Sequence, residues 1–345
     1  MKENENHSIV TIKDIAQRLK LSVSTVSRAL RNSTEIREET RRMVKELAKE
    51  LHYSPNPIAL SLKEKKSKII GVVVPEIANN FCSATIAGIE DVAYKNGYHV
   101  AIVQSHETYE REVINTQLLV SRRVDGLIVS VSNETHEYGH LAEIIEKGIP
   151  LVMFDRVCEE IQTHKVIVND YQGAYDATMH LIDEGYTRIA HLTISKYLSI
   201  TRSRLQGYTD ALKARNIPVR DEWIFHCDFK TSSVDEAIHT LFSGNDRPNA
   251  ILASVERIAI GCLQPLKEMQ LRIPQDVALV GFSDNPINQF MNPSLTTVQQ
   301  PTFDMGQKAA ELLLKLIETK NRPKKFQTIT LNTFLDVRDS SRGKG

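Results

Sequence analysis

The chain lacks the features that mark secreted, disulfide-stabilised or membrane-spanning proteins. Its 345 residues include only four cysteines, and no two of them have C-x-x-C spacing, so we expect reduced, mostly buried thiols. No apolar run reaches the ~18 residues of a membrane-spanning helix. The N-terminal segment 1–6 is polar and does not resemble a signal peptide. We therefore expect a cytoplasmic protein with no membrane partner.

Sequence motifs for common catalytic chemistry are also missing. No G-x-G-x-x-G follows the first apolar run, and there is no P-loop and no G-x-S-x-G. One literal zinc-protease signature occurs, H-E-x-x-H at 136–140. It needs a stable helix, which Gly139 weakens, so an exposed helix start is favoured. We expect no enzyme, no cofactor and no metal; the alternative is a zinc hydrolase using His136, Glu137 and His140.

Net charge is absent as well, because 43 lysines and arginines balance 43 acidic residues. The balance hides an asymmetry, since residues 1–68 hold 15 basic and 9 acidic residues. The remainder is correspondingly acidic. A basic N-terminal segment on an acidic body fits a DNA-binding domain attached to a sensor.

Three apolar patterns of helical period occupy the N-terminal segment. The first runs from Ile12 to Leu19, and Thr11 with Asp14 forms a short variant of the capping box. After a brief turn, Ser22 can cap a second helix, and a third pattern runs from Thr40 to Leu51. Helix, short turn and helix is the arrangement that places a second helix in the DNA major groove.

The second of these helices presents side chains that suit DNA. Arg28 can donate two hydrogen bonds to guanine, Ser24 can adapt to several base edges, and Val23 can touch a thymine methyl. Phosphate contacts, which fix register, could come from Ser22, Thr25 and Ser27. A helix start rich in serine and threonine could also be only a cap. The three-helix pattern and the basic charge favour DNA binding.

A short apolar segment follows. Asn56 can cap a helix, Pro57 takes the favoured first position, and 58–62 gives barely two turns before the charged run 63–66. Isolated helices shorter than ~12–15 residues are marginal in water, so this helix needs a partner to fold. The alternative is a plain polar linker.

From Ile69 onward, short apolar runs alternate with helical stretches. The run 69–74 is almost wholly apolar, as expected of a strand buried on both faces. Similar runs occur at 100–103, 126–129, 150–154, 166–168, 189–192, 251–253 and 277–280. So many units imply parallel sheets with right-handed crossovers, arranged as two α/β lobes. In such sheets a ligand binds beyond the carboxyl ends of the strands, and polar residues follow many of these runs.

Three blocks resemble the N-terminus of lactose-repressor-family (LacI/GalR) regulators: 11–16, 22–30 and 53–56. Further matches extend over nearly the whole chain, at 122–128, 154–156, 204–208, 281–284 and 293–298. The resemblance implies an N-terminal all-α helix-turn-helix domain and an α/β periplasmic-binding-protein-like core of two lobes with parallel sheets. The chain is expected to cross between the lobes three times.

The implied domains follow from this resemblance. Residues 1–55 form the DNA-binding domain, 56–68 the hinge helix and linker, 69–338 the effector-binding and dimerisation core, and 339–345 a tail. Lobe 1 comprises about 69–167 and 299–326, and lobe 2 about 168–298 and 327–338.

The resemblance also implies site residues. Val23, Ser24 and Arg28 would read bases, and Leu62 would wedge between base pairs. The expected DNA-binding residues are Thr11, Ser22, Val23, Ser24, Thr25, Ser27, Arg28, Tyr53, Asn56, Ala59 and Leu62. The expected effector-binding residues, with Arg204 as the commonest anchor, are Asn79, Phe81, Asp155, Arg156, Arg204, Glu256, Ser283 and Asp284. The family often has Asn-Asp where this chain has 255–256, and Asp at Ser283, which leaves the effector open.

We therefore predict a cytoplasmic, nucleoid-associated, homodimeric transcriptional regulator that binds a pseudo-palindromic operator in double-stranded DNA. It is expected to be a repressor controlled by a small polar effector, such as a sugar or sugar derivative, bound between the lobes. The alternative is a cytoplasmic sugar-binding sensor that acts through a protein partner. A sugar-transport protein should carry a signal peptide and no basic head.

Overall fold

The computed structural model describes residues 10–53, 66–229, 231–319, 323 and 325–343. The chain divides into two compact units, Met1–Ser67 and Lys68–Gly345, called here the head and the body. The predicted hinge helix, with Asn56, Ala59 and Leu62, lies outside the described residues.

The head contains three short helices, α1 (Ile12–Leu19), α2 (Val23–Leu30) and α3 (Glu38–Glu50). This confirms the three helical patterns. The apolar positions turn inward because they recur at helical period. The buried core of the head consists of Ile15, Ala16, Val26, Ala29, Val44 and Ala48.

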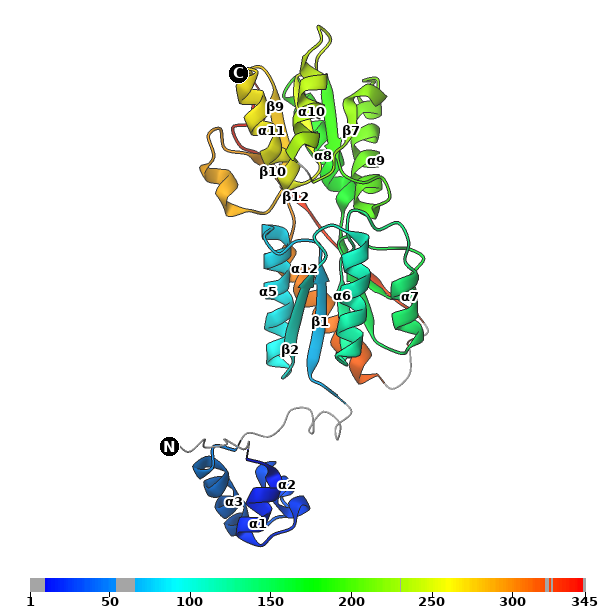
Figure 1. Ribbon diagram of the computed structural model, residues 1–345. Coiled ribbons are helices and arrows are strands. Elements are labelled where there is room, and N and C mark those ends of the chain that lie inside the picture. Colours follow the sequence, from blue (N-terminus) through cyan, green and yellow to red (C-terminus); the bar gives the residue numbers. More distant parts are fainter. Residues whose placement is uncertain (1–9, 54–65, 230, 320–322, 324, 344–345) are drawn as a thin grey trace, which may run out of the picture. The chain divides into compact units, whose positions relative to one another are not determined.

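The body contains two sheets with helices packed against them (Figure 1). The first sheet has the order β11-β5-β4-β3-β1-β2 and is parallel throughout. Its strands are β1 (Ile69–Val74), β2 (His99–Gln104), β3 (Gly126–Val129), β4 (Leu151–Phe154), β5 (His164–Val168) and β11 (Thr328–Leu331). Its lobe also holds α5 (Asn80–Lys95), α6 (Tyr109–Ser121), α7 (Gly139–Glu146) and α12 (Thr302–Glu318).

The second sheet has the order β12-β10-β9-β8-β6-β7, with only β12 antiparallel to its neighbour. Its strands are β6 (Ile189–Thr193), β7 (Ile224–His226), β8 (Ala250–Ala253), β9 (Ala278–Phe282), β10 (Thr296–Gln299) and β12 (Phe334–Asp336). The helices are α8 (Asp170–Asp183), α9 (Ser199–Ala214), α10 (Thr231–Phe242) and α11 (Glu256–Glu268), with the short 3₁₀ turns η1 (Asp221–Trp223) and η2 (Pro286–Phe290).

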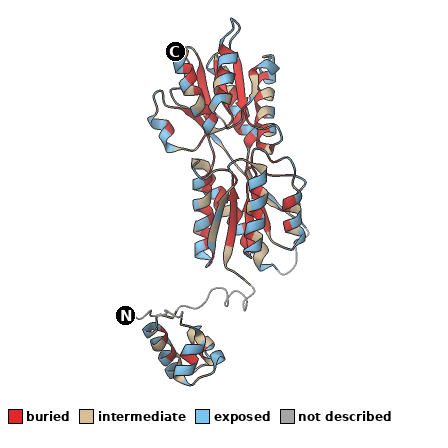
Figure 2. Cartoon of the chain, viewed as in Figure 1, coloured by how far each residue is buried: buried red, intermediate tan, exposed pale blue. Residues whose placement is uncertain are grey.

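The central strands carry the core of each lobe, as Figure 2 shows by the buried residues along them. Strand β1 pairs with β2 on one side and β3 on the other, with Ile70 opposite Val100 and Gly126. Its residues from Ile70 to Val74 are all buried. The near-continuous apolar run is therefore explained by helices on both faces of the sheet.

The chain passes between the lobes three times, after β5, after β10 and after β11. The last passage differs from the sequence interpretation. Residues 328–331 pair with β5, Ile329 opposite Val166, so β11 belongs to lobe 1, whereas we expected 327–338 in lobe 2. Only β12 lies there, paired with β10. The strand β11 was hard to place because it alternates polar and apolar residues and is only partly buried.

Candidate functional site

The start of α2 is held by its own hydroxyl groups. The Ser22 Oγ accepts a hydrogen bond from the Thr25 backbone N–H (3.1 Å) and lies 2.8 Å from the hydroxyls of both Ser24 and Thr25. At the start of α1, Thr11 and Asp14 form the predicted capping box. The expected caps are present. They keep the first turn of α2 regular, with Val23 and Ser24 on the exposed surface.

Arg28 extends from the last turn of α2 with 45% of its side chain exposed. Its guanidinium forms an ion pair with Glu35 (3.0 Å) and donates to the Ser24 carbonyl oxygen (3.4 Å). The guanidinium expected to read guanine is thus positioned by a carboxylate from the loop after α2. Sequence reasoning missed Glu35, because nothing in its spacing ties it to α2.

Two other predicted DNA-binding residues have contacts within the head. Tyr53 packs against the head core, its backbone N–H bonds the Ala48 carbonyl (2.8 Å), and burial raises the pKa of its hydroxyl. Ser27 accepts a hydrogen bond from Arg31 (3.3 Å). Both contacts stabilise the head, and the DNA contacts of these residues stay predictions.

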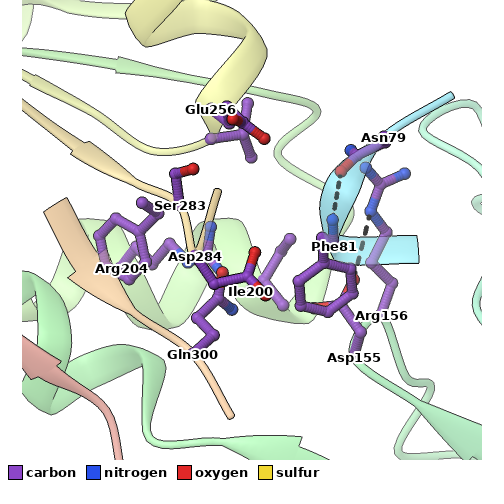
Figure 3. Close-up of a pocket in the computed structure, with 12 residues that line it drawn as sticks. Asn79, Phe81, Asp155, Arg156, Ile200, Arg204, Glu256, Ser283, Asp284 and Gln300 are labelled. Atoms are coloured by element: carbon purple, nitrogen blue, oxygen red, sulfur yellow. Dashed lines mark hydrogen bonds and ion pairs between the residues drawn. The ribbon is translucent and has the colours of Figure 1, made fainter. Parts of the chain in front are cut away.

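The eight predicted effector residues line one hollow between the lobes of the body, here called the cleft (Figure 3). It contains about 400 Å³ of empty space, counting the part open to solvent. Four further lining residues were not predicted: Ile200, Val255, Phe282 and Gln300. Phe282 and Val255 are next to predicted residues, whereas Gln300 follows β10, a strand that the sequence did not reveal.

The two arginines of the cleft are buried and already paired. The Arg156 guanidinium bonds both carboxylate oxygens of Glu107, at 2.6 and 3.2 Å. Arg204 binds Asp170 (2.6 Å) and the Ser254 carbonyl oxygen, and its guanidinium stacks 4.1 Å from the centre of the Phe282 ring. Arg204 therefore holds lobe 2 together, so we expect its removal to destabilise the fold as well as alter the cleft.

Three carboxylates also face the cleft. Burial raises the pKa of Asp155 to about 6, although Arg156 and Arg204 oppose the rise. Burial likewise raises the pKa of Glu256. Asp284 accepts hydrogen bonds from Asn80 (3.1 Å) in lobe 1 and from the Thr302 hydroxyl. Asp284 thus joins the two lobes directly at the cleft.

The H-E-x-x-H segment does not form a zinc site. Helix α7 begins at Gly139, so His136 lies before it, and its Nδ1 is 2.8 Å from the Glu134 carbonyl oxygen. His140 is buried with its Nε2 2.9 Å from Glu112, so the expectation that this segment is an exposed helix start is wrong for His140. Glu112 also accepts from Ser132 and Thr135, which explains its burial. Among the described residues, no group of three suitable side chains could hold a metal ion.

All four cysteines are free and buried, as predicted. Within the described ranges, none of the helices is both long and apolar enough to cross a membrane.

A helix-turn-helix head joined to a two-lobed α/β body with a polar cleft defines a DNA-binding regulator that responds to a small molecule. Family models agree: residues 11–56 match the bacterial regulatory proteins of the lacI family, and 178–341 match the periplasmic binding protein-like domain. The chain belongs to the lacI family and is a DNA-binding transcriptional repressor.

Similarity to individual relatives covers almost the whole chain. The transcriptional repressor PurR of Vibrio vulnificus is 33% identical over 334 residues, 96% of this chain and 98% of its own. The ribose operon repressor of Haemophilus influenzae is 32% identical over 333 residues, with the same coverage of 96% and 98%. A solved lacI-family regulator from Enterococcus faecium with bound ribose is 26% identical, covers 80% of this chain and 100% of its own, and has a TM-score of 0.70.

Proposed function

We propose that the protein acts as a homodimer that represses transcription from a pseudo-palindromic operator and releases it when a sugar or sugar derivative occupies the cleft. The observation that carries the proposal is that all eight predicted effector residues line one hollow between the lobes. The ribose bound to the Enterococcus faecium regulator supports a sugar as the class of ligand.

The cleft offers a physical route for control. Its lining comes from both lobes, Phe81 and Asp155 from one and Glu256 and Ser283 from the other. A ligand that contacts both lobes favours the lobe arrangement in which those contacts are best, and shifts the population toward it. Residues 56–68, predicted as a hinge helix and linker, would transmit that shift to DNA because so short a helix folds only with a partner.

A footprinting and binding assay tests the DNA half of this proposal, on the DNA upstream of the protein's own gene, at several salt concentrations and with unrelated competitor. The wild type should protect a palindromic site. Arg28→Ala should weaken operator binding by about 1–3 kcal/mol and relax base preference. Arg42→Ala, which removes an exposed arginine of α3, is the control. Undiminished discrimination by the Arg28 variant would refute its base-reading role.

The effector half uses the same DNA and a panel of sugars. Phe81→Ala should leave operator binding intact and abolish sugar-dependent release, because Phe81 lines the cleft and lies outside the head. Glu90→Ala, an exposed change on the same helix α5, should respond as wild type does. If the Phe81 variant keeps the wild-type dose response, the cleft is not the effector site.

A further inference from the structure

We propose that the cleft selects an uncharged, hydroxyl-rich ligand and rejects phosphorylated ones, and that Glu256 is the residue that determines this choice. The inference rests on the proposed effector function of the cleft. It narrows that function from sugars and their derivatives to neutral sugars.

The fixed charges of the cleft lining are predominantly negative. Three lining carboxylates, Asp155, Glu256 and Asp284, face two guanidiniums. The charge of each guanidinium is already balanced, because Arg156 is paired with Glu107 and Asp155 and Arg204 is paired with Asp170. The nearby cation Arg257 is exposed above the Phe229 ring and is not among the lining residues. A bound phosphate would therefore lie among carboxylates, and like charges repel.

The helix starts at the cleft also carry groups that disfavour an anion. The backbone N–H groups at a helix N-terminus bind phosphates, and α5 begins at the cleft. The Asn79 side chain, however, already accepts the hydrogen bond of the Phe81 N–H (2.8 Å; Figure 3). At α11, the first residue is itself the carboxylate Glu256. An anion at these helix starts would therefore meet the Asn79 side-chain oxygen at α5 or the Glu256 carboxylate at α11.

Three buried polar atoms of the lining have no hydrogen-bond partner within the described residues. Two are donors, the Gln300 Nε2 and the Arg156 Nε, and one is an acceptor, the Glu256 Oε1, one oxygen of a carboxylate that also interacts with Asn285 and Ser283. Gln300 and Arg156 are more than nine-tenths buried, at 7% and 6% exposure. Buried polar groups without partners are rare and destabilising, so the set indicates what a ligand must supply.

A hydroxyl group meets both needs, because it donates and accepts. It can donate to Glu256 and accept from Gln300 or Arg156, whereas an ionised phosphate group beside Glu256 would set two negatively charged acceptors against each other. The lining contains two aromatic residues. Phe81 is free to pack against a sugar ring, while the Phe282 face is covered by Arg204. Hydroxyls on a neutral ring are thus the chemistry that the cleft recognises.

Isothermal titration and thermal-shift measurements on the full chain test this, with paired probes: D-ribose beside ribose 5-phosphate, and D-glucose beside glucose 6-phosphate. Cellobiose, a neutral disaccharide, extends the panel. At least one neutral member should bind at millimolar concentration or below. Its phosphate ester should bind at least about 100-fold more weakly.

The variant Glu256→Gln separates charge from shape. It should bind the neutral sugar about tenfold more weakly, because a charged acceptor becomes neutral. The difference in affinity between the neutral sugar and its phosphate ester should become smaller. Glu268→Gln, at the exposed far end of the same helix, should change neither affinity. Unfolding midpoints of the ligand-free variants report whether each variant is folded.

Three results would overturn the inference: tighter binding of a phosphate ester than of its neutral parent, failure of every neutral member to bind, or an unchanged difference in affinity in Glu256→Gln. Operator release is measured in parallel. A phosphate ester that releases operator would leave the proposed effector control intact and refute only this selectivity. A neutral sugar that binds without release would confirm the selectivity and refute the control.

Discussion

The carboxyl group of Asp155 is buried at the cleft. This residue follows β4 with a left-handed backbone (φ 55°) and is 7% exposed. Burial raises its pKa from the ordinary 3.8 to about 6. The folded chain therefore holds this proton more tightly than the unfolded chain does, and the stability linked to it is complete below about pH 3.8 and lost as pH rises through about 6. At neutral pH the carboxylate destabilises the fold, which is consistent with a binding role.

Asp155→Asn should remove that penalty. Asparagine tolerates the left-handed backbone and carries no charge. Relative to wild type, the variant's free energy of unfolding should rise by up to about 3 kcal/mol between about pH 4 and pH 7. That free energy corresponds to the difference between the pKa of Asp155 in the folded chain, about 6, and its ordinary value of 3.8. Urea unfolding at a series of pH values measures the difference, with Glu143→Gln, an exposed carboxylate of α7, as the control. A difference that does not change with pH would contradict the argument.

At the scale of elements, each lobe contains one pair of helices in very close contact. In lobe 1, α5 and α12 meet at two glycines: a Cβ on Gly88 would overlap the Phe303 carbonyl oxygen, and one on Gly306 would overlap the Thr85 carbonyl oxygen. In lobe 2, a Cβ on Gly207 of α9 would overlap the Tyr171 carbonyl oxygen of α8. Only glycine allows backbones to approach this closely, so these positions fix the helix spacing beside the cleft.

Gly88→Ala should therefore destabilise lobe 1 by about 2 kcal/mol or more, because the clash is with backbone that must move as a whole. Gly139→Ala is the matched control, since a Cβ there meets nothing within 4 Å. The control should be neutral or slightly stabilising, because alanine favours the helix. Urea unfolding midpoints of the two variants measure this difference in stability. Equal midpoints would show that α5 can move away from α12 without a loss of stability.

For the whole molecule, the sequence predicted what strong periodicity and strand ends determine. The three head helices and the buried central strands belong to this class, whereas the particular cleft residues were selected by the resemblance to the family. Contacts made by tertiary packing were not predictable: the Arg28–Glu35 pair, the burial of His140 by Glu112, and the place of Gln300. The short strands β7, β10, β11 and β12 were also missed, because strands of three or four residues carry little pattern.

The head and the body differ greatly in the size of their cores. The head buries six apolar residues, and three of these are alanines, whereas several large clusters fill the body. Small units bury a smaller share of their surface and are less stable. Since the two units are separately compact, we expect them to unfold in two steps, the head first.

Scanning calorimetry of the full chain should resolve these steps, and two matched core variants assign them. Val26 in the head and Val280 in β9 are both fully buried. Val26→Ala should lower the first midpoint by roughly 10 °C, because about 2 kcal/mol is a large share of the stability of so small a unit. Val280→Ala should lower only the second, and by less, because the body is larger. A single transition that both variants lower would show instead that head and body unfold as one unit. In that case the folding of the DNA-reading helix and the folding of the cleft would be thermodynamically coupled in the free protein, before any operator is bound.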